Sequence, residues 1–595
     1  MWPVFYLALL LQAGTSSPAN SSPAASPPAT PGASPTASPT ASKAQSADAA
    51  FRAGRAALSR NDLPAAEADF ARVARIVPQV AVGHAAYGAV LLQEGKLAAA
   101  AKELEQARRI DPHDHGTELN LALAYAQQQR YAESIDLFKA LAAAQPSLPA
   151  DASAAYAQAL AATGDAAGAE RQLARAVDAN PENAALHDSL GVVLMQQQKV
   201  SQAQPEFERA IALGKDNVLA HYHLGSLFLV TRKTQEAVNE LTTAAALAPN
   251  DPAVVLQLGR ALGAAGQDNQ AITTLRHALD LAPASVDAKY ALALELQNAG
   301  QVKEALLLFQ QTIQARPNDP AALTNLALAM VQSGDAKQAV PYYRKALLLD
   351  ANNPTLHEDM GVAYLQSSDL DHAIQEFQSG LALDQHNAQL RYDLGLAYKL
   401  KDNLPQAISA FELAEQDDPA LPDPPYTLGV LYMQLGRFPD ASRELEKATQ
   451  MGPENGDAWA LLGSVYHQMG QQKEAADALH RAIALLPQQP GPHVTLGAVL
   501  AEEGDAAAAK AERKIAADLS RTAMAHQRAS FALDSGKVLL KKGRLPEAVA
   551  QLQTAISAEP DNAEAHLALA EALTRQGKSA EAALERQKAS ALAPH

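Results

Sequence analysis

The sequence predicts an all-α protein, a solenoid of antiparallel helix pairs, and three observations support this prediction. A glycine or alanine recurs sixteen times, at intervals of 34 residues with two exceptions. A second small residue follows each of them by twelve residues, and a proline closes most of the units. A fixed period of this length is typical of chains in which each unit is one helical hairpin that stacks on its neighbours.

One unit is complete over residues 457–487. Its first helix carries aromatic residues and a leucine–glycine pair, a glycine ends it, and a second helix of small and apolar residues runs to a closing proline: Trp459, Leu462, Gly463, Tyr466, Gly470, Ala475, Leu479, Ala482 and Pro487. We number the places of the repeat so that Gly463 is the eighth. The eighth places of repeats 1 to 16 are Gly54, Gly88, Ala122, Ala157, Gly191, Gly225, Gly259, Ala293, Ala327, Gly361, Gly395, Gly429, Gly463, Gly497, Gly536 and Ala570.

Close packing explains these residue types. Two antiparallel helices approach tightly only where the facing side chains are small, so the eighth and twentieth places mark the crossing of each pair. Larger side chains such as Phe309 and Phe411 fill the space beside the crossing, where an error in volume is destabilising. A proline such as Pro249 has no amide donor and clashes with the preceding turn, so it ends the second helix.

The pattern resembles the tetratricopeptide repeat (TPR), a 34-residue unit with these residue types in the same order. The resemblance covers the chain from Ala47 to its end, about sixteen tandem repeats, and suggests an exported bacterial TPR protein. It implies a right-handed superhelix of helix pairs. It also implies a concave groove, lined by the first helices, that holds an extended peptide or a partner helix.

Places two, five, nine, twelve and thirteen of the first helix lie on one side of it at about 100° per residue, and the resemblance makes this side the groove. Tyrosines, carboxylates and amides there offer flat apolar contact and hydrogen bonds to a peptide, and the carboxylates favour a basic ligand. The alternative is that the tyrosines only pack against neighbouring repeats. The candidate groove residues are Tyr222, Tyr290, Gln332, Glu358, Gln366, Tyr392, Asp393, Tyr426, Gln434 and Gln468.

The start of the chain differs from the repeats. Residues 1–13 read MWPVFYLALLLQA, an apolar run that is shorter than the roughly 20 residues of a membrane span. The length suits the core of a secretory signal, although no Lys or Arg precedes it. We therefore expect export to the periplasm or envelope, with a cytoplasmic location as the alternative. Residues 14–46 are almost only Ser, Pro, Ala and Thr, which predicts a disordered linker.

The repeats are expected over residues 47–504, followed by an irregular repeat over 505–528 and a C-terminal pair of repeats over 529–595. The span from 505 to 542 has no proline and is basic within an acidic chain. We predict a lengthened helix with a solvated face there, and a docking patch for an acidic partner is the alternative. Proline is also replaced at three regular joints, where the second helix could run on into the next repeat: Lys215, Ala351 and Gln385.

Composition and motifs exclude several classes of function. The net charge of −17 argues against a nucleic-acid surface, and the chain has no cysteine for a zinc site or a disulfide. No phosphate loop, dinucleotide-binding glycine motif or nucleophile elbow occurs. His221 and His223 lie two residues apart on a helix and point away from each other, so we expect no metal there. We predict no enzyme, no cofactor, no metal and no transmembrane span.

The sequence therefore predicts a non-enzymatic scaffold that binds a peptide or protein partner along the groove, with each repeat adding a small contact. Two alternatives remain open. One is an accessory or assembly subunit of an envelope polysaccharide or secretion system. The other is a cytoplasmic chaperone-like adaptor.

Overall fold

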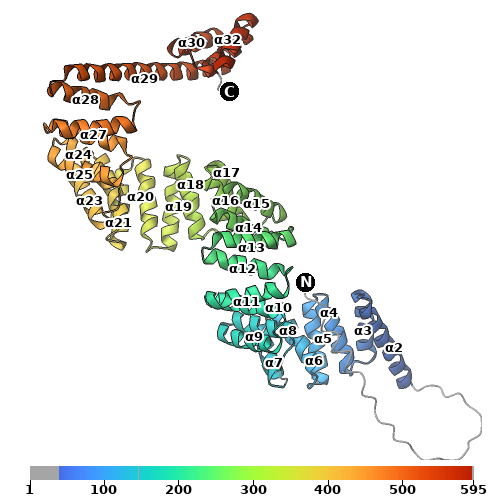
Figure 1. The fold of residues 1–595 in the computed structure, drawn as a ribbon. Helices are drawn as coiled ribbons and strands as arrows, with labels where there is room; N and C mark the ends of the chain where they lie inside the picture. Colours follow the sequence, from blue (N-terminus) through green and yellow to red (C-terminus); the bar gives the residue numbers. More distant parts are fainter. Residues whose placement is uncertain (1–38, 145–146, 593–595) are drawn as a thin grey trace, which may run out of the picture. The chain divides into compact units, whose positions relative to one another are not determined.

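The protein is described by a computed structural model that covers residues 39–144 and 147–592. These residues form thirty-one helices, α2 to α32, and contain no strand. The predicted all-α fold of stacked helix pairs is confirmed. The chain divides into two compact units, residues 1–312 and 313–595, and each is a stack of such pairs (Figure 1). The predicted signal segment, 1–13, lies outside the described residues.

The helices of unit 1 form eight pairs, each made of the first and second helix of one repeat. They are α2 (Pro39–Ser59) with α3 (Leu63–Ile76), α4 (Ala81–Gln93) with α5 (Leu97–Ile110), α6 (His115–Gln127) with α7 (Tyr131–Ala144), α8 (Ala150–Ala162) with α9 (Ala166–Ala179), α10 (Ala184–Gln196) with α11 (Val200–Leu213), α12 (Val218–Val230) with α13 (Thr234–Leu247), α14 (Pro252–Ala264) with α15 (Asp268–Leu281), and α16 (Val286–Asn298) with α17 (Val302–Ala315), whose last residues belong to unit 2.

Unit 2 has the same pairing except in repeats 14 and 15, which share the helix α29. Its helices are α18 (Pro320–Gln332) with α19 (Ala336–Leu349), α20 (Pro354–Gln366) with α21 (Leu370–Leu383), α22 (Ala388–Leu400) with α23 (Leu404–Asp417), α24 (Asp423–Gln434) with α25 (Phe438–Met451), α26 (Gly456–Gln468) with α27 (Gln472–Leu485), then α28 (Pro490–Glu502), the long α29 (Ala506–Lys541), α30 (Leu545–Ala558), α31 (Ala563–Arg575) and α32 (Ser579–Leu592).

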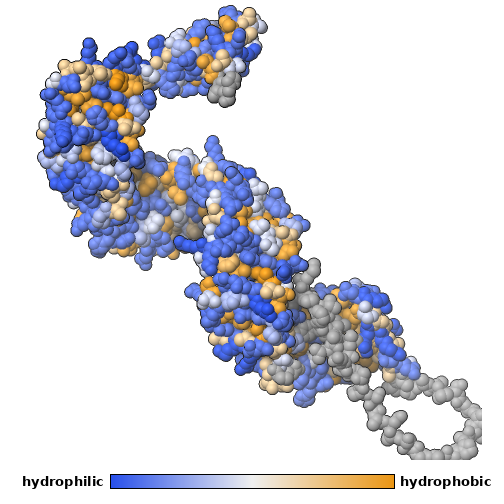
Figure 2. Space-filling view, in the orientation of Figure 1, coloured by the Kyte–Doolittle hydropathy of each residue, from blue (hydrophilic) through white to orange (hydrophobic). Residues whose placement is uncertain are grey.

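The crossing of each pair is packed as the small residues predict. A Cβ atom added to Gly361 would lie 2.5 Å from the ring of Phe377, and one added to Gly395 would lie 2.6 Å from Phe411. Both rings are fully buried. The surfaces of the two units are mainly hydrophilic on the face seen in Figure 2, with interrupted hydrophobic patches along the stacked helices. Burial therefore concentrates at the contacts within and between pairs.

At the three joints that lack a proline, the second helices end at the same place in the repeat as elsewhere. The suggestion that they could run on into the next repeat is therefore wrong. Helices α11, α19 and α21 stop at Leu213, Leu349 and Leu383. An asparagine then caps the next helix in each case, because its side-chain oxygen accepts a hydrogen bond from a backbone N–H of the first turn. These caps are Asn217 to Ala220 N (3.3 Å), Asn353 to Thr355 N (3.1 Å) and Asn387 to Leu390 N (3.0 Å).

Helix α29 runs through the span in which we predicted a lengthened helix, and its sequence explains the length. It has 36 residues, about 54 Å at 1.5 Å per residue. The interval before Gly536 is 39 residues, so five residues are added to the joint. The joint has no proline, and Arg528 stands at the place where Asn217 or Asn353 caps other repeats. With neither stop signal present, the second helix of repeat 14 and the first helix of repeat 15 are continuous.

The first helix begins earlier than expected. Helix α2 starts at Pro39, whereas we expected the disordered linker to reach residue 46, so the boundary is corrected by eight residues. Lys43, Ala44 and Gln45 are good helix formers, and they extend the helix ahead of its first buried residue, Ala47. The rest of the predicted linker, 14–38, lies outside the described residues. No helix among those described is long and apolar enough to cross a membrane.

A polar contact that we did not predict from the sequence joins the two helices of six repeats. A histidine at the fourth place, half-buried at His357 and buried in the other five, has its Nδ1 within 2.5–2.7 Å of a glutamate Oε2 at the twenty-third place: His84–Glu103, His187–Glu206, His221–Glu240, His357–Glu376, His493–Glu512 and His566–Glu585. In four of them Nε2 also donates to a backbone carbonyl six residues earlier, as His187 does to Pro181 O (2.9 Å). Trp459 replaces the histidine in repeat 13 and donates from Nε1 to Pro453 O (3.0 Å).

Candidate functional site

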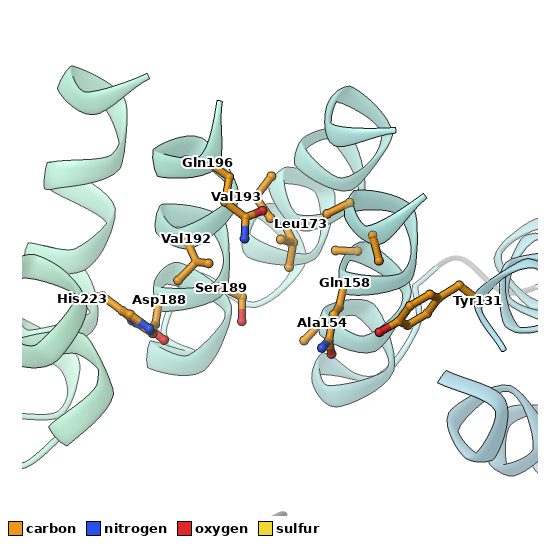
Figure 3. Close-up of a pocket in the computed structure, with 13 residues that line it drawn as sticks. Tyr131, Ala154, Gln158, Leu173, Asp188, Ser189, Val192, Val193, Gln196 and His223 are labelled. Atoms are coloured by element: carbon orange, nitrogen blue, oxygen red, sulfur yellow. The ribbon is translucent and has the colours of Figure 1, made fainter. Parts of the chain in front are cut away.

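A pocket of about 590 Å³ lies on the first helices of repeats 4 and 5 in unit 1, and we call it the α8–α10 pocket (Figure 3). Most of its lining comes from α8 and α10, with single residues from α7, α9 and α12. Places five, nine and thirteen of both first helices face it, which are places that we assigned to the groove. The lining residues are Tyr131, Ala154, Ala157, Gln158, Ala161, Ala162, Leu173, Asp188, Ser189, Val192, Val193, Gln196 and His223.

The small residue at the fifth place of repeat 4 leaves room for the pocket. In repeats 8 and 11 a tyrosine at this place covers the aromatic residue of the second helix. The ring of Tyr290 lies 6.0 Å from that of Phe309, and the ring of Tyr392 lies 5.3 Å from that of Phe411. Repeat 4 has Ala154 instead, so its second-helix residue, Leu173, becomes part of the pocket lining. The volume that a tyrosine ring fills elsewhere is open here.

One end of the pocket is polar. Asp188 Oδ1 lies 2.8 Å from His223 Nδ1, and Asp188 is only 8% exposed. In Figure 3 these two side chains point toward each other, and the Tyr131 hydroxyl points toward Gln158 at the opposite end. Gln158 and Gln196 each carry an amide with donors and an acceptor. The apolar floor of the pocket can hold a peptide side chain, and the polar groups around it can form hydrogen bonds with the peptide backbone.

The contact between Asp188 and His223 shows the register of neighbouring repeats. It joins the fifth place of one repeat to the sixth place of the next, 35 residues later. The same register in unit 2 brings the Tyr392 hydroxyl to 3.2 Å from Thr427 Oγ1. Between repeats 10 and 11 it pairs Glu358 with Asp393, so two carboxylates stand where other repeats have complementary groups.

These carboxylates are shielded from water, which raises their pKa values. Burial, followed by the charge of Glu358, raises the pKa of Asp393 to about 6. Burial, again followed by Glu358, raises the pKa of Asp359 to about 6, and burial alone raises that of Glu358. Gln389 Nε2 donates to Asp393 Oδ1 (3.3 Å). The first helices α20 and α22 therefore present a region in which a cation would be favoured.

The candidate groove residues are distributed over both units. Tyr222 and Tyr290 belong to unit 1, and the other eight belong to unit 2. All four candidate tyrosines are half-buried, and burial raises the pKa values of Tyr392 and Tyr426. The four glutamines are exposed, and each is the last residue of its first helix: Gln332, Gln366, Gln434 and Gln468. Partner contact by any of these residues stays a prediction.

None of the ten candidates lines the α8–α10 pocket, so our selection by residue type missed it. A scan of the fifth place for alanine would have returned Ala154 together with Ala85 and Ala460. The two histidines considered as a metal pair have separate partners. His221 contacts Glu240 and Lys215 O, whereas His223 contacts Asp188. In residues 39–144 and 147–592 no group of three or more side chains could hold a metal ion.

Stacked helical hairpins define a helical repeat protein, and the fold supports a role as a scaffold for protein interaction. Sequence models of the tetratricopeptide repeat match residues 91–150, 155–200, 189–252, 231–296, 290–355, 330–394 and 426–490, and a TPR repeat model matches residues 536–577. The matches cover well over half of the chain. The chain belongs to the TPR family, whose fold serves as a scaffold for protein interaction and is typically not enzymatic.

Solved structures of TPR proteins align with parts of the chain. One is the APC/C hetero-tetramer Cut9–Hcn1, at 15% identity over 78% of this chain and 98% of that chain, with a TM-score of 0.37. Another is YrrB, described as a TPR protein with an unusual peptide-binding site, at 20% identity over 33% of this chain and 97% of that one, TM-score 0.28. A structure of MamA aligns at 25% identity over 28% and 92%, TM-score 0.27. No curated protein matches this sequence.

Proposed function

We propose that the chain binds an extended segment of a partner protein along its first helices, and that the α8–α10 pocket receives one apolar side chain of that segment. The pocket carries this proposal. Its volume of about 590 Å³ is within the range of about 300–1,000 Å³ that ligand pockets occupy. An apolar floor with a few polar groups at its ends is the usual composition of such a site.

The polar groups of the pocket suit a peptide backbone. Gln158 and Gln196 can each donate to a carbonyl and accept from an N–H, which is how an extended segment satisfies its backbone in a groove. Asp188 is held by His223, so its orientation is fixed before a ligand arrives, and a fixed polar group lowers the entropic cost of binding.

We propose in addition that the partner is basic where it meets unit 2. Glu358, Asp359 and Asp393 lie together on α20 and α22, and burial raises the pKa of each. A lysine or arginine side chain placed beside them would stabilise their charged forms. This favours a segment that carries cationic residues.

We propose an exported, periplasmic or envelope-associated location on the basis of the apolar run over residues 1–13. Its length fits the core of a secretory signal. Sequencing of the N-terminus of the protein purified from its native cells tests this. An intact start at Met1 together with a cytoplasmic fraction would refute it.

The binding proposal is tested by photocrosslinking in cells from the pocket. A photoreactive residue at Gln158 should give a discrete protein adduct, and the same probe at the exposed Arg171 on α9 should not. In a chain that also carries Ala154→Tyr, the adduct from Gln158 should be lost. This substitution places a tyrosine at the fifth place of repeat 4, as in repeats 8 and 11, so it fills the pocket with a side chain that the fold accommodates in other repeats. Equal adducts from both sites, or an adduct that survives Ala154→Tyr, would contradict the proposal.

A further inference from the structure

Helix α29 exposes a row of large apolar side chains, which we call the open face: Met524, Phe531 and Val538. Their exposed fractions are 69%, 76% and 49%. They are seven residues apart, and seven residues turn a helix by nearly two full turns, so all three lie on one side. Phe531 and Val538 occupy the third and tenth places of repeat 15.

The same two places are buried in the other repeats that have a helix before them. The buried residues at the third place are Gly83, Thr117, Ala152, Leu186, Ala220, Val254, Ala288, Ala322, Leu356, Leu390, Pro424, Ala458, Pro492 and Ala565. The buried residues at the tenth place are Val90, Ala124, Ala159, Val193, Leu227, Ala261, Ala329, Ala363, Ala397, Leu431, Val465, Val499 and Ala572. The tenth place of repeat 8, Glu295, is half-buried. The second helix of the preceding repeat covers the third place, whereas the tenth place of repeat 8, Glu295, lies against Gly263 of the preceding first helix, α14. A Cβ atom added to Gly380 of α21 would lie 3.0 Å from Leu390, and one added to Gly83 would lie 2.9 Å from Val73 of α3.

Repeat 15 lacks this cover because of the continuous helix. The second helix of repeat 14 is the first part of α29 itself, so it runs on in line and cannot fold back over the next first helix. Helix α29 packs against α28 near its start and against α30 and α31 near its end (Figure 1). The position that a second helix takes elsewhere is therefore open beside Phe531 and Val538.

The size of the exposed residues argues that this position is used. In repeat 1, whose first helix also has no described helix before it, the third and tenth places are Ala49 and Ala56, and both are exposed. Small residues at these places leave little apolar surface in water. Phe531 and Val538 are instead at least as large as the residues that are buried at these places in other repeats. Exposed apolar clusters of this kind mark interaction sites.

Charge indicates what kind of helix would fit. Arg528, Lys541 and Lys542 lie beside the open face together with one exposed carboxylate, Asp534, and the three cations make no ion pair within the described part of the chain. The chain as a whole carries a net charge of −17, so this basic stretch is a local exception. A second copy of α29 on the same face would bring the basic residues of both copies together. An acidic helix would pair with them.

We propose that the open face of α29 is a docking site for an amphipathic α-helix with acidic flanks, supplied by a partner protein, which takes the position of the missing second helix. Its apolar side would cover Phe531 and Val538, as α23 covers α24, and its carboxylates would meet Arg528, Lys541 and Lys542. This site is separate from the groove of the first helices, so it does not depend on the proposed function.

A peptide copied from the chain itself is a suitable probe. Helix α23 has the sequence LPQAISAFELAEQD, with three acidic residues and no basic one, and it covers α24 in unit 2. A fluorescent 404–417 peptide, stapled as a helix between the exposed positions 405 and 409, is titrated with the full-length protein and followed by fluorescence anisotropy. A second peptide has lysine in place of each acidic residue.

We expect the acidic peptide to bind, and the double variant Phe531→Ala/Val538→Ala to raise its Kd at least tenfold. The control is Leu348→Ala on α19, which removes an apolar side chain that is 81% exposed and far along the chain from α29, and it should change the Kd less than twofold. Binding should weaken as salt is added, because the flanking contacts are ionic.

Three results would overturn the proposal. The first is no binding of the acidic peptide up to about 1 mM, a concentration at which even a weak helix–groove contact is detected. The second is equal binding of the lysine peptide, or no loss in the double variant. The third is a wild-type dimer, seen by light scattering, that the double variant converts to a monomer, since a second copy would then be the occupant.

Discussion

Replacing Asp393 by asparagine should stabilise unit 2, and the gain should depend on pH. Burial and Glu358 raise the pKa of Asp393 to about 6 in the folded chain, against 3.8 for an ordinary aspartate. The folded state therefore holds a proton that the unfolded state has lost between pH 4 and 6, so stability falls as the pH rises through this window. Above pH 6 the whole penalty is present, and below pH 4 it is absent.

The size of the effect follows from the pKa difference. The interval from 3.8 to about 6 corresponds to about 3 kcal/mol, since one pKa unit is worth about 1.36 kcal/mol. This is an upper limit for Asp393→Asn, because Glu358 shares the interaction. Asparagine has the same shape, and its Oδ1 still accepts the hydrogen bond from Gln389. The change therefore removes the charge and leaves the packing.

Amide hydrogen exchange and urea unfolding of the full-length protein measure this prediction. At pH 8 the amides of α22 should exchange up to about 100-fold more slowly in Asp393→Asn, since about 1.4 kcal/mol is a factor of ten. At pH 4 the urea midpoints of variant and wild type should coincide. The matched control is Asp188→Asn, in the same register but facing His223 in place of a carboxylate, which should bring no gain in stability at pH 8. A destabilised Asp393→Asn at pH 8, or a gain equal at both pH values, would refute the reasoning.

Two further substitutions test other parts of the fold. His187→Ala removes the contacts with Glu206 and Pro181 O and should lower the free energy of unfolding by about 2–3 kcal/mol. The control is Lys289→Ala, at the same place in a repeat without this contact, which should lower it by less than about 0.5 kcal/mol. Urea unfolding of the two variants and the wild type measures both values. Arg528→Pro breaks α29 in its middle and should cost about 3 kcal/mol. Hydrogen exchange should speed up around residue 528 and stay unchanged in α18 to α25, since stability in stacked repeats passes only between neighbours. Faster exchange throughout α18 to α25 would contradict this.

Features that recur in every repeat could be predicted from the sequence, whereas features that depend on one particular pair of residues could not. The crossing of the helices is readable because Gly361 and Gly395 recur with the period, and a small residue there has one packing reason. The lengthened α29 is readable because its joint lacks both the proline and the capping asparagine, with Arg528 at the place of the cap. The early start of α2 was missed, since Pro39 and the serines before Lys43 favour a linker by composition and a helix only by continuity with the buried Ala47.

The functional surface is less readable for a physical reason. The α8–α10 pocket is set by Ala154, a residue that attracts no attention by its own chemistry and matters only because tyrosine stands there in other repeats. The raised pKa of Asp393 depends on burial and then on Glu358, which is 35 residues away and becomes its neighbour only through the stacking of repeats. The histidine–glutamate contacts were detectable, because the 19-residue interval occurs six times. The exposure of the side chains at the third and tenth places of repeat 15 is explained only by the structure, in which no second helix precedes that repeat.

The histidine–glutamate contact also bears on how such a chain can change its length. Both partners belong to the same repeat, so copying, deleting or moving a whole repeat carries the contact along intact. His566 and Glu585 keep it in repeat 16, beyond the irregular 39-residue interval. The contact between Asp188 and His223 spans a joint and is lost if a repeat is inserted between them. Contacts of the first kind make the unit portable, whereas those of the second kind record which repeats have remained adjacent.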